Sequence, residues 1–403
     1  MKDQEFFERA AGWVTVPLSE AALIGAGNSA PQKKELFESG RHPFIRTSDV
    51  GQIGFGEIGE ARDLLNDAGV AKLRRVTSGA ILMPKSGAST FLNHRVQTTV
   101  DAYVSSHLAT IEARKKKALP RYLLYYLSTV KAQDLIQDHK YPSLTLGVIG
   151  NIPIPLPPLE EQKRIVAVLD QAFAALDRAR AHAEANIASA DDLFGSILDA
   201  TLAMDTDGWS RYALRSLGKV QTGSTPKTSE PQNYGAHLPF IKPGDFRSDG
   251  SLVLDNEGLS ETGAAKARRV PAGSALMVCI GATIGKAGFT DAEIATNQQI
   301  NSITPKEGVS GEFLYYQFIT PKFQREVTKR SGQATLPIVN KSKWSEIEVA
   351  MPQDKDAQLQ VVDRLRTARR HTEHLIAAYQ ERLSDISNLR QSFLQQAFTG
   401  RLT

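Results

Sequence analysis

The chain has 403 residues, of which 41% are apolar and 23% charged, with a net charge of +4 and a pI near 8.9. This length allows two or three domains with their own cores, and the weakly basic charge permits a polyanionic partner without requiring one. A single cysteine, Cys279, excludes a disulfide framework and a cysteine-based zinc site within the chain. Its apolar neighbours predict a buried structural thiol, in preference to a nucleophile.

The first residues carry acids, Asp3 and Glu5, where a secretory signal requires basic and then apolar residues. No stretch approaches the ~20 apolar residues of a membrane span. We therefore expect the protein to be cytoplasmic.

Short apolar segments broken by Gly, Pro, Ser and Asp make residues 1–155 typical of strands and turns. Residues 80–83 and the β-branched stretch 98–111 are the clearest strand candidates. One helix is predicted over residues 121–136, where apolar residues recur at helical spacing. A counterpart is predicted over residues 312–327. Both segments contain a Tyr-Tyr pair, for which we expect a role in core packing.

Four prolines at positions 153, 155, 157 and 158 predict an extended strut, since each fixes φ and removes a donor. A helix of about 65 Å is then predicted over residues 159–203, which contain no proline. Its apolar residues recur in steps of three and four, the pattern of a coiled-coil seam. The predicted seam is Ile165, Leu169, Ala172, Leu176, Ala179, Ala183, Ile187, Ala190, Phe194 and Ile197.

The second half follows the same plan, with a β-rich globule over 207–351 and a long helix over 354–398. The predicted seam of this helix is Leu365, Ala368, Thr372, Leu375, Tyr379, Leu383, Ile386, Leu389, Phe393 and Ala397. Two seamed helices of equal length should bury their seams against each other, and the globule between them favours antiparallel pairing. The alternative is that each helix lies on its own globule.

The two halves also share residues at an offset of 196 positions. The matches are Trp13 with Trp209, 43–45 with 239–241 (Pro-Phe-Ile), Asp49 with Asp245, Gln162 with Gln358, Leu169 with Leu365, Ser196 with Ser392, and Leu198 with Leu394. Each unit is far longer than a solenoid or propeller repeat, which indicates a duplicated domain with its connector. Such a pseudo-symmetric chain is suited to reading two related targets or holding two identical partners.

Motifs of catalysis are missing or incomplete. Residues 281–287 resemble a phosphate-binding loop but are one residue short between the glycines and lack the Ser or Thr for magnesium, so a strand-edge turn is predicted. No Asn/Asp-Pro-Pro-aromatic motif, dinucleotide fingerprint or nucleophile-elbow serine is present. His371 and His374 share a helix without a matching ligand set. We expect this chain to carry out no chemistry itself.

Several stretches, taken in order, resemble one family. They are 43–46 with Asp49, 239–242 with Asp245, 273–276, 297–300, the Pro-rich bridge with Glu-Glu-Gln at 154–165, and the tail 389–402 containing Gln-Ala-Phe-x-Gly-x-Leu. Over essentially its whole length the chain resembles the specificity subunit of type I restriction-modification enzymes. The bridge and the tail are the most specific of these motifs.

The resemblance implies an α+β fold with two similar β-rich target recognition domains, separated by two long helices in an antiparallel coiled coil. The expected boundaries are 1–155 and 205–352 for the domains and 156–204 and 353–403 for the helices. It also implies that each domain reads one half of a split DNA target. The implied partners are two DNA adenine methyltransferase subunits and two motor-nuclease restriction subunits. S-adenosylmethionine, ATP and magnesium would belong to those partners, with no cofactor in this chain.

The two halves differ at one motif. Asn297-Gln298-Gln299 aligns with Ser105-Ser106-His107, so the two domains should read different half-sites of an asymmetric target. The start of the second long helix, residues 352–358, also resembles the family's helix-entry motif less closely than the start of the first does.

Basic and polar residues on predicted loops are the candidates for DNA contact, because Lys and Arg neutralise phosphates and Arg, Asn and Gln read base edges. In the first domain they are Arg46, Thr47, Ser48, Lys85, Ser86, Asn93, His94 and Arg95. In the second they are Lys227, Lys242, Arg268, Arg269, Lys286, Asn297, Gln298 and Gln333. An ordinary solvated side chain, or for 297–299 a backbone-satisfying role, is the alternative for each. Asp49 and Asp245 are expected to organise their own turns.

The densest basic segment is 114–117 (Arg-Lys-Lys-Lys), for which phosphate contact and a plain solvated connection are both open. Two other functions also remain open. A stand-alone bipartite DNA-binding regulator would need no methyltransferase and would purify without one. A nuclease fused to a coiled coil would need a magnesium-binding cluster of carboxylates and lysine, and the purified chain would cut DNA.

Overall fold

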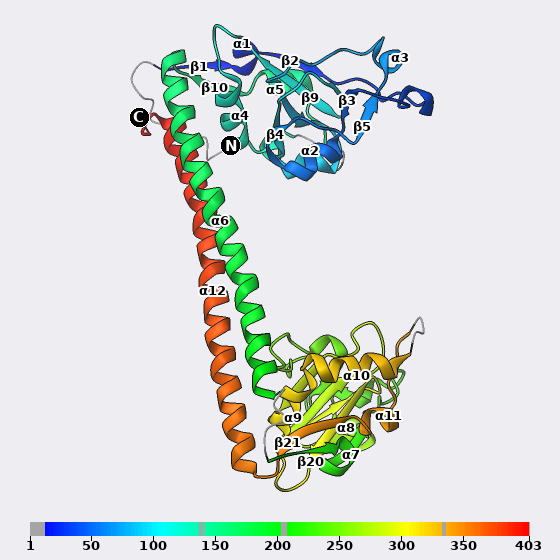
Figure 1. Cartoon of the computed structure of the whole chain (residues 1–403). Coiled ribbons are helices and arrows are strands. Elements are labelled where there is room, and N and C mark those ends of the chain that lie inside the picture. Colours follow the sequence, from blue (N-terminus) through cyan, green and yellow to red (C-terminus); the bar gives the residue numbers. More distant parts are fainter. Residues whose placement is uncertain (1–12, 137–139, 141, 203–207, 333–335, 403) are drawn as a thin grey trace. The chain divides into compact units, whose positions relative to one another are not determined.

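The computed structural model describes residues 13–136, 140, 142–202, 208–332 and 336–402. The chain divides into two compact units (Figure 1). Unit 1 comprises Met1–Ala183 with Glu381–Thr403, and unit 2 comprises Glu184–Gln380. Each unit therefore combines one globule with part of both long helices. Among the described residues, no helix has the length and apolar character that crossing a bilayer requires.

Unit 1 is built on a five-stranded sheet in the order β2-β9-β6-β7-β4, beside a three-stranded sheet in the order β5-β3-β8. Its strands are β1 (Val14–Pro17), β2 (Ala22–Ala26), β3 (His42–Ile45), β4 (Phe55–Ile58), β5 (Asp63–Leu65), β6 (Ile81–Pro84), β7 (Arg95–Thr98), β8 (Tyr103–Val104), β9 (Leu108–Ala113) and β10 (Pro153–Leu156). Its short helices are α1 (Leu18–Ala21), η1 (Lys34–Leu36), α2 (Thr47–Ile53), α3 (Asp67–Val70), η2 (Ala88–Leu92), α4 (Pro120–Thr129), η3 (Ala132–Asp134) and α5 (Leu146–Gly150).

Unit 2 has a four-stranded sheet in the order β12-β20-β17-β18, beside a three-stranded sheet in the order β14-β19-β16. Its strands are β11 (Trp209–Ala213), β12 (Gly218–Thr222), β13 (Tyr234–Gly235), β14 (Phe240–Ile241), β15 (Gly258–Leu259), β16 (Arg269–Val270), β17 (Ser274–Val278), β18 (Ala287–Thr290), β19 (Ile294–Thr296), β20 (Ile300–Pro305) and β21 (Glu348–Pro352). Its short helices are α7 (Leu214–Leu217), η4 (Pro231–Asn233), η5 (Pro243–Asp245), α8 (Glu261–Lys266), α9 (Gly311–Phe318), α10 (Pro321–Ser331) and α11 (Lys341–Ser345).

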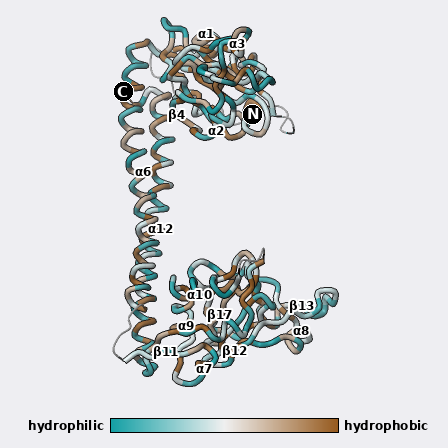
Figure 2. Tube along the Cα trace, turned by 45° about the vertical axis from the view of Figure 1, so that its right-hand side comes forward, coloured by the Kyte–Doolittle hydropathy of each residue, from teal (hydrophilic) through white to brown (hydrophobic). Residues whose placement is uncertain are grey.

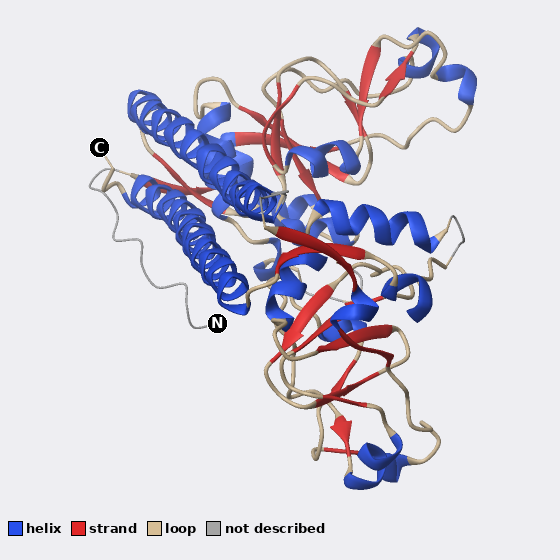
Figure 3. Ribbon diagram, turned by 60° about the horizontal axis from the view of Figure 1, so that its bottom comes forward, coloured by secondary structure: helices blue, strands red, loops and turns tan. Residues whose placement is uncertain are grey.

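The two units repeat one topology. The larger sheets share four antiparallel strands, with β2, β9, β6 and β7 corresponding to β12, β20, β17 and β18. The smaller sheets share a parallel pair, β3 with β8 and β14 with β19. Unit 1 adds β4, which pairs parallel with β7. Figure 3 shows the strands of both units in red.

The two long helices are α6 (Leu159–Leu202) and α12 (Lys355–Thr399), as the sequence predicted. The start of α6 and the end of α12 lie in unit 1, and the reverse holds in unit 2. In unit 1, Phe173 of α6 belongs to the same core cluster as Phe398 of α12. In unit 2, Leu198 of α6 shares a core cluster with Leu365 of α12. The helices thus pack antiparallel in each unit, and apolar residues recur along both of them (Figure 2).

The predicted seams are wrong at three positions. Leu375 and Leu389 are 43% and 49% exposed, and Ala179 is exposed as well. In α12 the half-buried stripe uses Ile376 and Arg390, one residue later in each case. The stripe observed in α12 keeps a strict alternation of four and three, whereas the prediction broke this alternation by choosing the apolar leucines beside it at 375 and 389. The observed stripe runs through positions 365, 369, 372, 376, 379, 383, 386, 390, 393 and 397.

The two predicted helices within the globules are shorter than expected. The helix predicted over 121–136 ends at Thr129, because Asn93 Oδ1 accepts the main-chain N–H of Ala132 (2.7 Å) and holds it outside the helix. The helix predicted over 312–327 is broken into α9 and α10. Pro321 starts α10, and Thr320 caps it by accepting the N–H of Phe323.

Other local predictions are confirmed. Tyr125 and Tyr315, one from each Tyr-Tyr pair, are buried in the cores of their units. The proline-rich bridge is extended, but it is strand β10, paired antiparallel with β1. Cys279 is buried, and burial raises the pKa of its thiol to about 12, which keeps it protonated at neutral pH.

A fully buried glutamine joins each globule to its long helix. In unit 1, Gln162 Oε1 accepts the N–H of Leu119 (2.9 Å). Its Nε2 donates to the main-chain oxygens of Lys117 (3.0 Å) and Pro157 (2.8 Å). One amide therefore ties the first turn of α6 to the segment that precedes α4.

Unit 2 repeats this joint with Gln358, which is also fully buried. Its Oε1 accepts the N–H of Ser310 (2.8 Å), and its Nε2 donates to the oxygens of Gly308 (3.1 Å) and Pro352 (3.0 Å). The match of Gln162 with Gln358 in the sequence repeat is thus a repeated structural joint.

Candidate nucleic-acid interface

In each unit, a glycine next to a strand of the larger sheet lies against the loop that follows a strand of the smaller sheet. Gly27 follows β2, and a Cβ added there would lie 2.1 Å from the main-chain oxygen of Ser105. Gly223 follows β12, and its Cβ would lie 2.2 Å from the main-chain oxygen of Asn297. Only a residue without a side chain allows this approach.

The loop touched by each glycine is the one at which the two sequence halves differ. The N–H of Ser105 donates to strand β3 (3.0 Å), and that of Asn297 donates to strand β14 (3.1 Å). Ser105 Oγ accepts the N–H of His107 (3.3 Å), just as Asn297 Oδ1 accepts the N–H of Gln299 (3.0 Å). The same backbone turn thus carries Ser-Ser-His in unit 1 and Asn-Gln-Gln in unit 2.

A second repeated turn follows β3 and β14. Asp49 Oδ2 accepts the N–H of Arg46 (2.8 Å), and Asp245 Oδ2 accepts the N–H of Lys242 (2.7 Å). Both aspartates are buried, and Asp49 is also bound by Arg62 Nε (3.0 Å). The prediction that these aspartates organise their own turns is confirmed, and those turns position two of the candidate DNA contacts.

In unit 2 these two turns meet in an open pocket of about 430 Å³. Lys242 Nζ lies 3.9 Å from a carboxylate oxygen of Glu257 and 5.7 Å from the ring centre of Phe240. The Gln298 amide oxygen accepts a hydrogen bond from the hydroxyl of Thr225. The pocket is lined by Thr225, Thr228, Pro231, Tyr234, Phe240, Lys242, Glu257, Asn297 and Gln298. Three candidates from two separate parts of the sequence, Lys242 and the adjacent Asn297 and Gln298, are therefore brought together.

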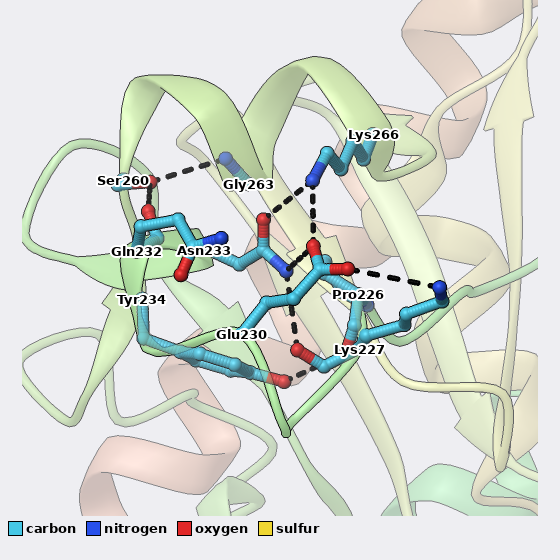
Figure 4. Close-up of polar contacts among 9 residues, drawn as sticks. All are labelled: Pro226, Lys227, Glu230, Gln232, Asn233, Tyr234, Ser260, Gly263 and Lys266. Atoms are coloured by element: carbon cyan, nitrogen blue, oxygen red, sulfur yellow. Dashed lines mark hydrogen bonds and ion pairs between the residues drawn. The ribbon is translucent and has the colours of Figure 1, made fainter.

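A polar network holds the loop that forms one wall of this pocket (Figure 4). Lys266 Nζ of α8 donates to Asn233 Oδ1 and to a Glu230 carboxylate oxygen, both at 2.9 Å. Asn233 is fully buried and donates to the main-chain oxygen of Lys227 (3.1 Å). The hydrogen bond from Lys266 is the main cause of the lowered pKa of Glu230. The candidate Lys227 thus lies exposed on a braced loop, with its Nζ 3.7 Å from Glu230.

The candidates of unit 1 around the corresponding turn are partly engaged. Arg46 forms an ion pair with Asp63, and its guanidinium lies 5.4 Å from the ring centre of Phe44. Thr47 and Ser48 begin α2, and Ser48 is exposed. Both residues are close to Arg46 in the chain, so the start of α2 presents a small polar and basic group.

Lys85 is half-buried just after β6. The next candidate, Ser86, has its Oγ 2.7 Å from His107 Nδ1, so it meets the turn that carries Ser-Ser-His. This contact brings a further candidate from a separate part of the chain to that turn.

Two candidates of unit 1 bind other parts of the unit through their side chains, and one of them is buried. Arg95 is 1% exposed, and its guanidinium donates to the oxygens of His94 (2.7 Å) and Val130 (3.3 Å). Burial lowers the pKa of Arg95 to about 10 and also lowers that of His94. Asn93 binds Ala132 and Gln133 through its side chain. We therefore assign Asn93 and Arg95 to holding the segment after α4, Arg95 because it is buried and Asn93 because its half-buried amide is bound to that segment.

The arginines of unit 2 belong to a repeat that the sequence comparison missed. Lys-x-Arg-Arg-Val occurs at 72–76 and at 266–270. Arg268 is exposed, but its Nη1 donates to the oxygen of Thr222 (2.8 Å) and its N–H to Ser224 Oγ (2.9 Å). Arg269 pairs with Glu293 (3.0 Å). The pattern Lys-x-Arg-Arg-Val in both halves is the sequence signal that could have identified this repeat.

Lys286 is exposed in the turn that joins β17 to β18. Gly285 donates its N–H to the oxygen of Val278 (2.9 Å), which closes this turn at the strand edge as predicted. The candidate Gln333 lies outside the described residues. Within the described parts of the chain, no three His, Cys, Asp or Glu side chains gather closely enough to hold a metal ion.

Comparison with known proteins identifies the family to which this architecture belongs. The family model described as the type I restriction modification DNA specificity domain matches twice, over residues 11–184 and 206–383. The HindI specificity subunit of Haemophilus influenzae is 37% identical over 36% of this chain and 32% of its own length. The MjaIX specificity subunit of Methanocaldococcus jannaschii is 29% identical over 37% and 35%. The chain thus matches about a third of the length of these two relatives.

Two solved structures share the fold over nearly the whole chain. One comes from work on complex assembly and conformational transition of a type I restriction-modification system, with a TM-score of 0.81, 19% identity and coverage of 98% and 99%. The other is the HsdS subunit from Thermoanaerobacter tengcongensis, with a TM-score of 0.62, 19% identity and full coverage of both chains. With the family model matched in both halves, the chain belongs to the type I restriction-modification DNA specificity subunits.

Proposed function

We propose that this protein recognises a bipartite, asymmetric DNA sequence, with one half-site read by each unit. The observation that carries the proposal is the repeated turn after β8 and β19, which holds Ser105-Ser106-His107 in unit 1 and Asn297-Gln298-Gln299 in unit 2. One backbone frame with two sets of polar side chains is what reading two different half-sites requires.

The pocket of unit 2 has the chemistry for reading bases. Asn and Gln can donate and accept together at the adenine N6 and N7 positions, and Lys can donate to guanine O6 and N7. Gln298 and Lys242 are exposed, whereas Asn297 is half-buried and braces the turn. We propose Gln298 and Lys242 as base readers, and Arg46 with Ser48 in the corresponding place of unit 1. Arg268, Arg269, Lys227, Lys286 and Lys85 are proposed as phosphate contacts.

The partners that we propose are two DNA adenine methyltransferase subunits and two motor-nuclease restriction subunits. This chain would supply specificity and architecture without catalysis, acting on DNA in the cytoplasm. S-adenosylmethionine, ATP and magnesium would be bound by the partner subunits. Family membership supports these proposals.

A base-resolution methylation map of host DNA, with this gene intact and deleted, tests the proposal. We expect an adenine mark in a split, asymmetric motif to disappear on deletion. An unchanged map in a host whose methyltransferase partner is active would instead favour a stand-alone DNA-binding regulator.

Replacing Lys242 and Gln298 with alanine should change the methylated motif in one half-site only. Both side chains line the pocket of unit 2, and losing a base contact relaxes discrimination by about 1–3 kcal/mol at that position. Methylation maps of the variants provide the measurement. Lys306→Ala is the matched control, because this exposed lysine follows the opposite end of β20. An unaltered motif in both variants would remove these residues from the readers.

The basic segment 114–117 gives a different expectation. All four side chains are exposed, and the turn lies where Gln162 joins the globule to α6. Changing all four to glutamine should weaken binding to every DNA sequence alike, and each lost phosphate contact should reduce the salt slope by about 0.9. A fluorescence anisotropy titration at several salt concentrations measures this slope. Lys33→Gln with Lys34→Gln is an exposed control, and an unchanged slope in the fourfold variant would mean that the segment is only a solvated connection.

A further inference from the structure

Two phenylalanine–arginine contacts link the long helices, one in each unit. In unit 1 the guanidinium carbon of Arg390 in α12 lies 4.3 Å from the ring centre of Phe173 in α6. In unit 2 that of Arg369 in α12 lies 4.5 Å from the ring centre of Phe194 in α6. Both distances are within the range of a cation–π contact. In both units the aromatic ring comes from α6 and the cation from α12.

These four residues occupy only two positions of the internal repeat. Phe173 and Arg369 are separated by 196 positions, the offset of the repeat, and so are Phe194 and Arg390. Phe173 and Arg369 also occupy equivalent places in the two units. Phe173 contacts Tyr125 (ring centres 5.3 Å apart), and the guanidinium of Arg369 lies 5.6 Å from the ring centre of Tyr315, the equivalent of Tyr125. Two copies of one ancestral helix have therefore diverged into a phenylalanine copy and an arginine copy.

The arginines are held firmly in these places. Arg390 Nη1 also binds Asp177 (2.9 Å), and Arg369 Nη1 binds the hydroxyl of Tyr315 (2.6 Å). Both arginines are half-buried, whereas arginines are ordinarily solvated on a helix surface. Such bracing makes the position of each charge well defined, so any helix packed against it meets that charge.

The duplication creates a problem of partner choice. Because the two helices come from one repeat, α6 could pack antiparallel on the α6 of a second copy, and α12 on another α12. The first arrangement would place Phe173 against Phe194, whereas the second would place Arg369 against Arg390. Like charges brought together at a contact are strongly unfavourable, and separating the helices in this way loses both cation–π contacts.

We propose that the pairs Phe173–Arg390 and Phe194–Arg369 specify the pairing of α6 with α12 and exclude pairing of like helices between two copies of this chain. The device combines attraction in the correct pair with repulsion in one of the two wrong pairs, as specific helix pairs elsewhere do. It concerns the protein's own assembly, and it holds whether or not the proposed DNA target is correct.

The test uses the full-length chain with a protease site inserted between residues 204 and 205. The chain is folded and then cut, and its two fragments are diluted, reconcentrated and counted by native mass spectrometry. A mixed pair joins one fragment that carries α6 with one that carries α12, and a like pair joins two identical fragments. In the wild type, mixed pairs should exceed like pairs by roughly 100-fold. In R369F/R390F every pairing has phenylalanine on both sides, and the preference should fall at least about tenfold. R369M/R390M, which keeps side-chain length without charge, should give the same loss if the phenylalanine variant fails to fold.

The inverted variant F173R/F194R/R369F/R390F provides the decisive control, because it restores both contacts with the roles of the helices exchanged. It should recover the preference for mixed pairs, which a merely structural role of the four side chains would not produce. The proposal is overturned if the neutral variants keep the wild-type ratio of mixed to like pairs. It is equally overturned if the inverted variant, folded by circular dichroism, mixes as freely as R369F/R390F.

Discussion

Replacing Gln358 with alanine is expected to lower the free energy of unfolding of unit 2 by about 3 kcal/mol, one of the largest effects of a single truncation in this chain. The amide satisfies the N–H of Ser310 and the oxygens of Gly308 and Pro352 at a fully buried position. Alanine would leave these main-chain groups unpaired away from water, and each such group costs about 1–3 kcal/mol. Gln162→Ala should affect unit 1 in the same way.

Urea unfolding followed by tryptophan fluorescence measures both effects, because Trp209 and Trp344 report on unit 2 and Trp13 on unit 1. Gln360→Ala is the matched control in α12, since this exposed glutamine lies in the same turn region of the same helix. If Gln358→Ala unfolds at the same urea concentration as Gln360→Ala, the joint does not hold the globule to the helix.

Gly223→Ala should displace the turn of unit 2 that carries the proposed base reader Gln298. The added Cβ would lie 2.2 Å from both the oxygen of Asn297 and Oγ1 of Thr296, so the turn that carries Gln298 must move. Overpacking of this kind costs about 1–3 kcal/mol of stability. We also expect affinity for the intact target to fall on the order of 100-fold, toward the level of non-specific binding, since one half-site loses its reader.

Affinity for target and scrambled DNA, measured side by side, separates these two effects. The scrambled sequence should bind almost as before, because phosphate contacts outside the turn remain. Gly195→Ala is the control in the same unit, since its Cβ would meet nothing within 4 Å near the end of α6. Full target affinity in Gly223→Ala would show that the turn tolerates the shift and does not position the readers.

The long-range plan of the fold was predictable because periodicity and duplication are properties of the sequence itself. The seams predicted α6 and α12, and the 196-residue offset predicted two units of one design. Of the two helix errors, one came from a proline inside the predicted helix and the other from a distant residue. Pro321 broke a helix whose apolar spacing continued across it, and Asn93 took the N–H that would have extended α4. Local spacing contains no information about such a partner.

The sequence predicted which types of residue form the candidate site, but it did not predict which of those residues are buried. Lys242 and the adjacent pair Asn297 and Gln298 were predicted from two separate places in the sequence, and the fold brings them to one pocket. Arg95 was named for the same reason, yet it is buried against main-chain oxygens. An arginine's charge favours an exposed position, and only the folded chain shows where main-chain oxygens hold a buried one.

The close glycine contact and the main-chain bonds at 105 and 297 have a consequence for the history of such proteins. The frame that holds each reading turn is made largely of peptide groups, so it places few demands on the side chains at 106 or 298. On the proposed function, substitutions at those positions can therefore change the preferred bases while the protein stays folded. If each unit reads one half-site, as proposed, a single substitution at one of these positions changes the specificity for that half of the target and leaves the other half unchanged.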